Sequence, residues 1–217
     1  MPFPFHSVIS ARHLLVAVGL LFWLALAAGD GQSANAGQQA SSDTSNSLVG
    51  HVLVASPGMS DPRFAQTIII IVEHNSAGGW GLIVNRPVGE ALVDDLLVAQ
   101  DVERVGSSRV VGLYEGGPVE QERGFVLHTP DYVGDATLSI GGIAAVTVDV
   151  GVLRALAGSG GPQQASVVFG YAGWDAGQLE QEIERGDWAV RLADAALIFD
   201  GDRAGKWRKA IEEAEVI

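Results

Sequence analysis

Cysteine and basic residues are scarce in this sequence. The 217 residues include no cysteine, which excludes disulfides, thiolate metal sites, a cysteine nucleophile and lipid attachment to an N-terminal cysteine. Only 13 Lys and Arg stand against 26 Asp and Glu, so the formal net charge is −13. Non-specific affinity for nucleic acids comes largely from clustered Lys and Arg on phosphates, so direct binding to nucleic acid is not expected.

The common catalytic and nucleotide-binding motifs are absent as well. No G-x-S-x-G elbow, GxxxxGK loop, G-x-G-x-x-G turn or H-E-x-x-H helix occurs in the chain. No close spacing of ligand residues supports Glu73, His74 and His128 as a metal site. We therefore expect no metal and no cofactor.

The N-terminus has the composition of a secretory leader. Arg12 precedes the apolar run at residues 14–28, and the tripeptide Ala-Leu-Ala at 25–27 offers a small-x-small cleavage pattern. The run is shorter than the roughly 20 apolar residues that span a membrane. Residues 1–28 are therefore interpreted as a signal peptide or N-terminal anchor, and the protein is expected to be exported to the periplasm. Two alternatives stay open: an uncleaved leader would hold the protein at the membrane, and a mis-assigned start would leave it in the cytoplasm.

A polar segment separates the leader from the folded part. Residues 29–47 contain no bulky apolar side chain and no Lys or Arg. Such a segment cannot bury enough surface to offset the entropy lost on ordering, so we interpret it as a disordered linker. The folded domain is then expected over residues 48–217.

Hydrophobic patterns beyond the linker predict both strands and helices. Strands are predicted at 49–56, 66–74, 80–87, 109–115, 123–128, 136–140, 143–148 and 165–173. Helices are predicted at 90–99, 149–157, 176–185 and 204–215. The second and third strands form a predicted hairpin. Strands adjacent in sequence dominate and helices gather late in the chain, which favours an α+β fold.

A polar tripeptide ends the most apolar predicted strand. Residues 68–72 are five consecutive β-branched residues, and Glu73, His74 and Asn75 follow them directly. The end of a buried strand emerges at the rim of a sheet, where loops gather and ligands commonly bind. The structural alternative is that His74 is a hydrogen-bonded histidine at this rim.

Two further polar stretches flank the predicted hairpin. Asn85 and Arg86 end its second strand. Antiparallel pairing would place them at the edge opposite Glu73, unless the sheet curves into a barrel. Asp61 and Arg63 follow a glycine turn, and Arg63 is predicted to pair with a nearby carboxylate. In the structural alternative, one of the two arginines pairs with Glu73 and fixes a loop.

Gly116 and Gly117 form a third candidate feature. Two glycines before a proline allow a sharp turn and close backbone approach, which leaves amides available to bind an anion or a carbonyl. A plain tight turn between strands is the alternative. His128 ends its predicted strand as His74 does, so the two histidines are candidates to face each other.

The fourth feature is the aromatic stretch at residues 170–183. Tyr171 and Trp174 each combine an apolar body with one polar group, as the walls of a pocket do, although such residues also form cores. Asp175 and Gln178 match a capping box at the start of a helix.

Several motifs in sequence order resemble the YqgE/AlgH family. They are PGM at 57–59, DPRF at 61–64, EHN at 73–75, GLIVNRP at 81–87, GGPV at 116–119, RGFVLH at 123–128, GYAGW at 170–174 and GQLE at 177–180. The resemblance covers residues 48–215 and implies a compact α+β fold, whose curved, mostly antiparallel sheet closes into a pseudo-barrel with helices outside. It also implies a label of transcriptional regulator, without a defined biochemical activity. The leader and linker depart from the family pattern, as does Ala176, where a proline is common.

The leading interpretation is an exported module that binds a small molecule or a protein partner in a rim pocket. The residues assigned to it are Asp61, Arg63, Asn75, Asn85, Arg86, Gly116, Gly117, Tyr171, Trp174 and Gln178, with Glu73, His74 and His128 as catalytic candidates. A hydrolase-like enzyme would instead use His74 as a general base oriented by Glu73, with the glycine amides stabilising negative charge. A transcriptional regulator, as the family label implies, would act indirectly, because an exported acidic protein does not contact DNA.

Overall fold

The computed structural model describes residues 47–200 and 205–214. The strands are β1 (His51–Ala55), β2 (Ile68–Asn75), β3 (Gly78–Ile83), β4 (Pro87–Leu92), β5 (Val110–Glu115), β6 (Val119–His128), β7 (Thr137–Ile140), β8 (Ala144–Thr147), β9 (Ala165–Asp175) and β10 (Trp188–Leu192). The helices are α2 (Val93–Ala99), α3 (Gly151–Ala157), α4 (Gln178–Glu184), α5 (Ala195–Phe199) and α6 (Lys206–Glu213). The predictions for residues 1–28 and 29–46 lie outside the described residues.

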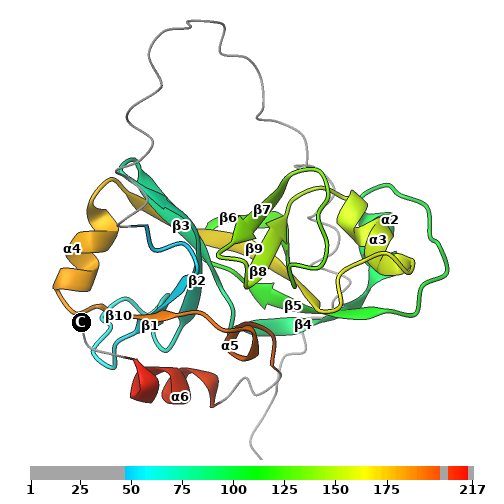
Figure 1. The fold of residues 1–217 in the computed structure, drawn as a ribbon. Coiled ribbons are helices and arrows are strands. Elements are labelled where there is room, and N and C mark those ends of the chain that lie inside the picture. Colours follow the sequence, from blue (N-terminus) through cyan, green and yellow to red (C-terminus); the bar gives the residue numbers. More distant parts are fainter. Residues whose placement is uncertain (1–46, 201–204, 215–217) are drawn as a thin grey trace, which may run out of the picture.

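The strands form one curved sheet with β9 at its centre (Figure 1). Their order is β10-β1-β2-β3-β9-β6-β8-β7, and the β4–β5 pair joins β9 as a side branch. β9 is 11 residues long, so its first half pairs with β5 and its second half with β3. Among the described strands only the pairing of β5 with β9 is parallel. The predicted α+β fold with a mostly antiparallel curved sheet is confirmed.

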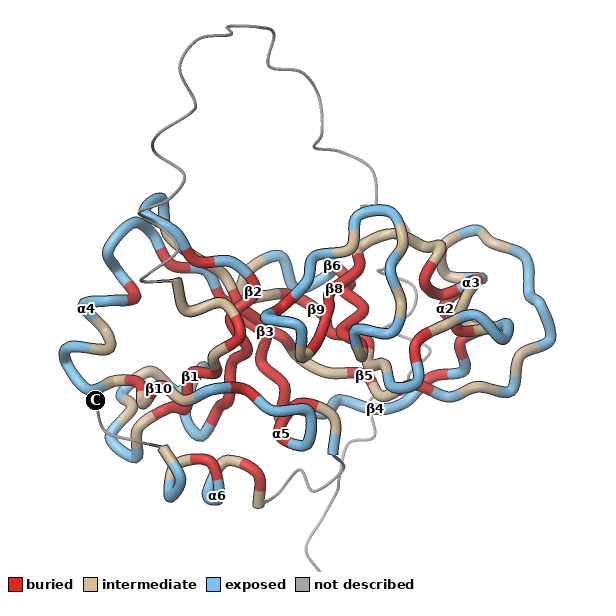
Figure 2. Tube along the Cα trace, viewed as in Figure 1, coloured by how far each residue is buried: buried red, intermediate tan, exposed pale blue. Residues whose placement is uncertain are grey.

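β2 is buried on both faces, which explains its unbroken apolar sequence (Figure 2). Ile68, Ile70 and Val72 belong to a core inside the curl of the sheet. Ile69 and Ile71 belong to a second core on the outer face, to which α4 contributes. A third core lies between the β5–β9 half of the sheet and helices α2 and α3. Side chains alternate along a strand, so a strand between two cores needs apolar residues at every position.

The curl closes where β7 approaches β2 and the residue before β1. Gly50 lies directly before β1 and Gly141 directly after β7, with φ of 84° and 57°. A Cβ on Gly50 would lie 3.3 Å from the Gly141 Cα atom. The two backbones can therefore approach this closely only because neither residue carries a side chain.

The hairpin is confirmed, but its second strand is shorter than predicted. β3 ends at Ile83, and a separate strand β4 begins at Pro87, which a proline can do because the first residue of an edge strand needs no amide donor. Because β4 continues to Leu92, the helix predicted at 90–99 begins only at Val93. The first three residues of the predicted helix, 90–92, therefore belong to a strand.

Two short elements have no counterpart among the predictions. β10 and α5 have five residues each, and β10 is held by pairing with β1, in which Val52 faces Arg191 across a large sequence separation. Such short segments carry too little periodicity to be distinguished from loops. None of the helices in the described residues is long and apolar enough to cross a membrane.

Candidate functional site

The side chains of Glu73 and His74 point to opposite faces of β2. A bulge between Ile71 and Glu73 shifts the register of β2 against β3. The Glu73 carboxylate is exposed and accepts hydrogen bonds from Asn75 Nδ2 at 3.1 Å and Trp80 Nε1 at 3.4 Å. Because neighbouring side chains on a strand point to opposite sides, Glu73 does not orient the His74 ring. The predicted pairing of these two residues as base and orienting acid is therefore wrong.

His74 is buried, with 7% of its surface exposed. Its Nδ1 atom accepts a hydrogen bond from the Leu48 amide at 3.3 Å, and the Ser47 hydroxyl donates to its backbone carbonyl at 3.1 Å. Its Nε2 atom lies 3.1 Å from Glu180 Oε1 on α4, although the contact is misaligned for a hydrogen bond. His74 thus holds Ser47 and Leu48 against β2 through its Nδ1 atom and its carbonyl, while its Nε2 atom faces Glu180 of α4.

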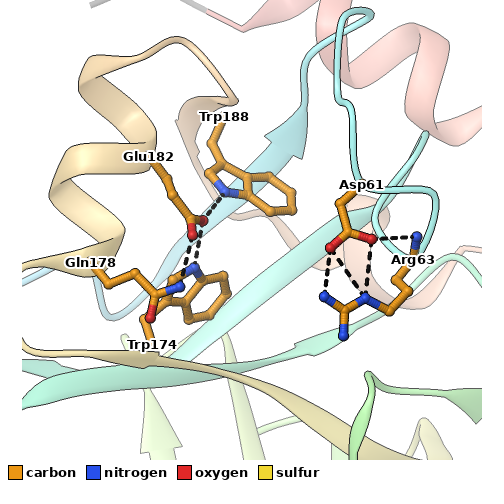
Figure 3. Close-up of polar contacts among 6 residues, drawn as sticks. All are labelled: Asp61, Arg63, Trp174, Gln178, Glu182 and Trp188. Carbon is orange, nitrogen blue, oxygen red and sulfur yellow. Dashed lines mark hydrogen bonds and ion pairs between the residues drawn. The ribbon is translucent and has the colours of Figure 1, made fainter.

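The Glu182 carboxylate connects α4 to two buried tryptophans (Figure 3). Its Oε2 atom accepts hydrogen bonds from Trp174 Nε1 and Trp188 Nε1, both at 2.8 Å, and its Oε1 atom accepts one from Gln178 Nε2 at 2.9 Å. Indole N–H groups need a partner when buried, and one carboxylate supplies both. Trp174 and Gln178 are therefore parts of the attachment of α4.

Only half of the predicted capping box forms at the start of α4. Gln178 Oε1 accepts a hydrogen bond from the Asp175 amide at 3.0 Å, as predicted. Gly177, with φ of 73°, is the residue before the helix, and no side chain caps it. Asp175 is displaced from the capping position because β9 extends to this residue.

Asp61 and Arg63 lie on the same outer face as Trp174 and Gln178 (Figure 3). Arg63 donates to both carboxylate oxygens of Asp61, with the shortest distance 2.7 Å from Nη2 to Oδ2, and these hydrogen bonds lower the pKa of the Asp61 carboxyl. Phe64 anchors the loop because its ring meets Trp188 edge to face at 5.6 Å. The predicted carboxylate partner of Arg63 is thus Asp61, two residues away.

Asn85 and Arg86 lie at the opposite end of the hairpin from Glu73. Asn85 Oδ1 accepts from the Ile68 amide at 2.8 Å and so extends the pairing of β2 beyond β3. Arg86 Nη1 lies 3.4 Å from Glu115 Oε1, so its carboxylate partner is not Glu73. The two polar ends of the hairpin are separated along the strands and form no shared site.

Gly116 and Gly117 lie beside the middle of β9, where its pairing partner changes from β5 to β3. The Gly116 amide donates to the Phe169 carbonyl at 2.7 Å, and the Gly116 carbonyl accepts from Ile83 at 2.9 Å. A Cβ on Gly116 would lie 2.2 Å from the Gly170 carbonyl oxygen, and one on Gly117 would lie 2.2 Å from Tyr171 C. The glycines serve a close backbone crossing, and the Gly116 amide is not available to an anion, contrary to the prediction.

Tyr171 and Trp174 point to opposite faces of β9. Tyr171 packs against the inner core, with ring centroids 5.9 Å from Trp80 and 6.1 Å from Phe125, and its burial raises the pKa of its phenol. Trp174 belongs to the outer core. The two aromatic residues therefore cannot form the walls of one pocket.

His74 and His128 lie at opposite ends of β9. His74 pairs with Gly79, which pairs with Trp174, whereas His128 pairs with Ala165. Nine positions along a strand correspond to roughly 30 Å at about 3.3 Å per residue. The two histidines do not face each other. In the described residues no group of three or more His, Asp or Glu side chains is arranged to hold a metal.

His128 is fully buried at one end of a directed hydrogen-bond chain. Its Nδ1 atom lies 2.7 Å from the Thr129 carbonyl, which can only accept, so Nδ1 carries the proton and Nε2 accepts from the Thr147 hydroxyl at 2.9 Å. Thr147 Oγ1 then accepts from Thr137 at 2.7 Å, and Thr137 Oγ1 accepts from the Gly134 amide at 3.1 Å. The neutral imidazole fixes the loop between β6 and β7.

We expect this histidine to make the fold sensitive to acid. Burial lowers the pKa of His128, although the Thr129 carbonyl and the charge of Asp131 oppose this shift. The unfolded chain, with a histidine pKa of about 6.5, then binds a proton before the folded chain does. The contribution of His128 to stability should therefore be fully present above about pH 6.5. The free energy of unfolding should fall as the pH drops below that value. Urea unfolding between pH 7.5 and 5 should show a shallower decline for His128→Gln, and an unchanged decline would contradict this assignment.

A groove of about 290 Å³ opens beside the parallel pair β5–β9. None of the predicted site residues lines it, although the buried His128 pairs with the lining residue Ala165. Its polar lining residues are Arg109, Tyr114, Gln163, Gln164 and Ser166. Arg109 Nη2 donates to the carbonyls of Pro162 at 2.6 Å and Gln163 at 3.0 Å, which joins segments far apart in sequence. The one sequence signal was Gly112 inside a predicted strand, because a glycine there often marks a close approach by a ligand or another backbone.

Comparisons with known proteins agree with this fold. The AlgH-like family profile matches residues 52–216. A UPF0301 protein of Cereibacter sphaeroides is 41% identical over 161 residues, which cover 74% of this chain and 88% of the relative. A UPF0301 protein of Rhodopseudomonas palustris is 42% identical over 174 residues, which cover 76% of this chain and 82% of the relative.

Two solved structures resemble this one. The solution structure of the AlgH protein from Pseudomonas aeruginosa is 36% identical, with a TM-score of 0.64 and coverage of 79% of this chain and 92% of that one. The crystal structure of protein DIP2367 from Corynebacterium diphtheriae, at 23% identity and a TM-score of 0.60, supports the fold alone. The profile match and the identity to the relatives together show that this chain belongs to the AlgH-like family.

Proposed function

We propose that the chain is an exported binding protein that holds a small polar molecule in the groove beside β5 and β9. The observation that carries the proposal is a shallow, open groove with several polar side chains, lined in part by two paired strands. Its volume, about 290 Å³, is near the lower limit of roughly 300 Å³ for ligand pockets. The ligand is therefore small.

The groove supports binding rather than catalysis. Its lining includes one hydroxyl nucleophile of the serine type, Ser166, but no histidine and no carboxylate to act as a general base. Two of the three predicted catalytic candidates, Glu73 and His74, point to opposite faces of β2 and lie outside the groove. The third, His128, pairs with the lining residue Ala165 but is fully buried and does not line the groove. A binding function needs none of these groups.

Export is proposed from the leader alone. Its charged flank, apolar run and small-residue exit at 1–28 are those of a signal peptide. The intact mass of the protein from fractionated cells tests this part, because cleavage near residue 28 removes the leader and a periplasmic fraction contains the shorter form.

A thermal-shift screen of small polar metabolites tests the binding site. A ligand present at 100 times its Kd stabilises the folded state by about 2.7 kcal/mol, which raises the Tm of a chain of this size by about 5–10 °C. Gln164 is exposed and lines the groove, so Gln164→Trp should fill the groove and remove the shift without disturbing the core. Gln181→Trp, at an exposed position on α4, is the matched control and should keep it. A hit that shifts both variants equally, or a screen without hits, would contradict the proposal.

A further inference from the structure

We infer that the groove ligand is an anion, a carboxylate or a phosphate, and that Arg109 binds it. This inference rests on the proposed function and specifies the chemical class of the ligand. It starts from the position of Arg109, which directly precedes β5, lines the groove and is half-buried.

The Arg109 guanidinium is fixed by one of its three nitrogens. Nη2 donates to the carbonyls of Pro162 and Gln163, so the side chain is held in place before any ligand arrives. Nη1 and Nε make no hydrogen bond to the described residues. A guanidinium donates through a planar fork that matches the two oxygens of a carboxylate or phosphate, and prior fixation reduces the entropy lost on binding.

Arg109 also lacks the counter-charge that most other arginines have. Six arginines in the described residues pair with carboxylates within 3.4 Å: Arg63, Arg86, Arg104, Arg123, Arg185 and Arg191. Arg109 has no carboxylate within 4.0 Å among the described residues, and its partners are neutral carbonyls. Arg154 and Arg208 share this lack of a carboxylate, but both are exposed to solvent. A half-buried cation without a protein counter-ion attracts an external anion more strongly than an exposed or already paired arginine does.

The rest of the lining is compatible with an anion. Gln163, Gln164 and Ser166 can each donate a hydrogen bond, and no carboxylate lines the groove. The nearby acid, Asp131, already accepts from the Gln163 amide at 3.1 Å and from the Thr129 hydroxyl. The groove therefore offers several hydrogen-bond donors and one fixed positive charge, which suits a small anion.

Titration of the labelled protein with inorganic phosphate and with acetate, followed by the amide NMR signals of Gly112 and Ser166, tests the inference. At least one of the two anions should shift these signals saturably, and the pair distinguishes a phosphate from a carboxylate ligand. Arg109→Gln should weaken binding at least tenfold, because hydrogen bonds to charged groups contribute that much or more. Arg154→Gln removes an equally unpaired charge that does not line the groove and should leave the affinity unchanged.

A second variant leaves Arg109 and its anchoring carbonyls in place. Gln163→Glu adds a negative charge to the lining and should also abolish anion binding, whereas Gln181→Glu on α4 should not. Equal affinity of the wild type and Arg109→Gln would overturn the inference. A neutral polar molecule that binds the groove, where neither anion does, would also overturn it and leave the proposed function standing.

Discussion

Gly116→Ala is expected to destabilise the protein by about 3 kcal/mol or more and to leave little soluble product. The new methyl group would lie 2.2 Å from the Gly170 carbonyl oxygen and 2.5 Å from Val168 Cγ1, and a backbone atom cannot move aside as a flexible side chain can. Overpacking of a well-packed interior typically costs about 1–3 kcal/mol, and a clash with the central strand belongs at the upper end. Urea unfolding measures the loss.

Two glycine variants separate the clash from other effects of alanine. Gly58 has open space around its Cβ position and no positive φ, so Gly58→Ala should change the stability by no more than a few tenths of a kcal/mol. Gly142 also has open space but a φ of 72°, so Gly142→Ala reports the conformational effect alone, about 1 kcal/mol. If Gly116→Ala is as stable as these controls, the backbone crossing beside β9 has room for a side chain, which would contradict this prediction.

Glu182→Leu is expected to have the second large effect, lowering the free energy of unfolding by about 2–5 kcal/mol. The substitution removes the acceptor of both Trp174 Nε1 and Trp188 Nε1. The two indoles are 7% and 4% exposed, and each buried donor without a partner costs about 1–3 kcal/mol. Urea unfolding followed by tryptophan fluorescence measures the loss and should also report a changed environment of the two indoles in the folded state.

Glu184→Leu is the matched control for this prediction. Glu184 lies on the same helix two positions further on, is exposed, and loses the same charge and gains the same side chain when substituted. The control should stay within about 0.5 kcal/mol of the wild type. Equal losses in both variants would mean that the Glu182 carboxylate is not the group that holds α4 on the sheet.

Contacts between near neighbours in sequence could be predicted. The run of β-branched residues at 68–72 required burial on both faces, and β2 has it. The pairing of Arg63 was predicted because its partner Asp61 is two residues away. The hairpin of β2 and β3 followed from two strands and a glycine loop. In each case the residues that interact lie within one local segment, so the local pattern contains the information.

The candidate site could not be predicted in the same way. A single bulge after Ile71 changes which face Glu73 and His74 occupy, and no residue type in the sequence marks it. Glu182 looks like a solvent-facing acid in its helix, yet two tryptophans from different strands bind it. These relations depend on which segments the sheet brings together.

By itself, the sequence determined the acidic net charge, the absence of thiol chemistry, the two-sided burial of β2 and the family to which the chain belongs. The tertiary structure alone decided that the two histidines lie far apart, that two glycines form a backbone crossing, and that Arg109 lines a groove with residues more than 50 positions away. The physical reason is that side-chain alternation and turn formation act over a few residues, whereas pairing around β9, including the parallel pairing with β5, joins segments whose proximity is set by the whole sheet.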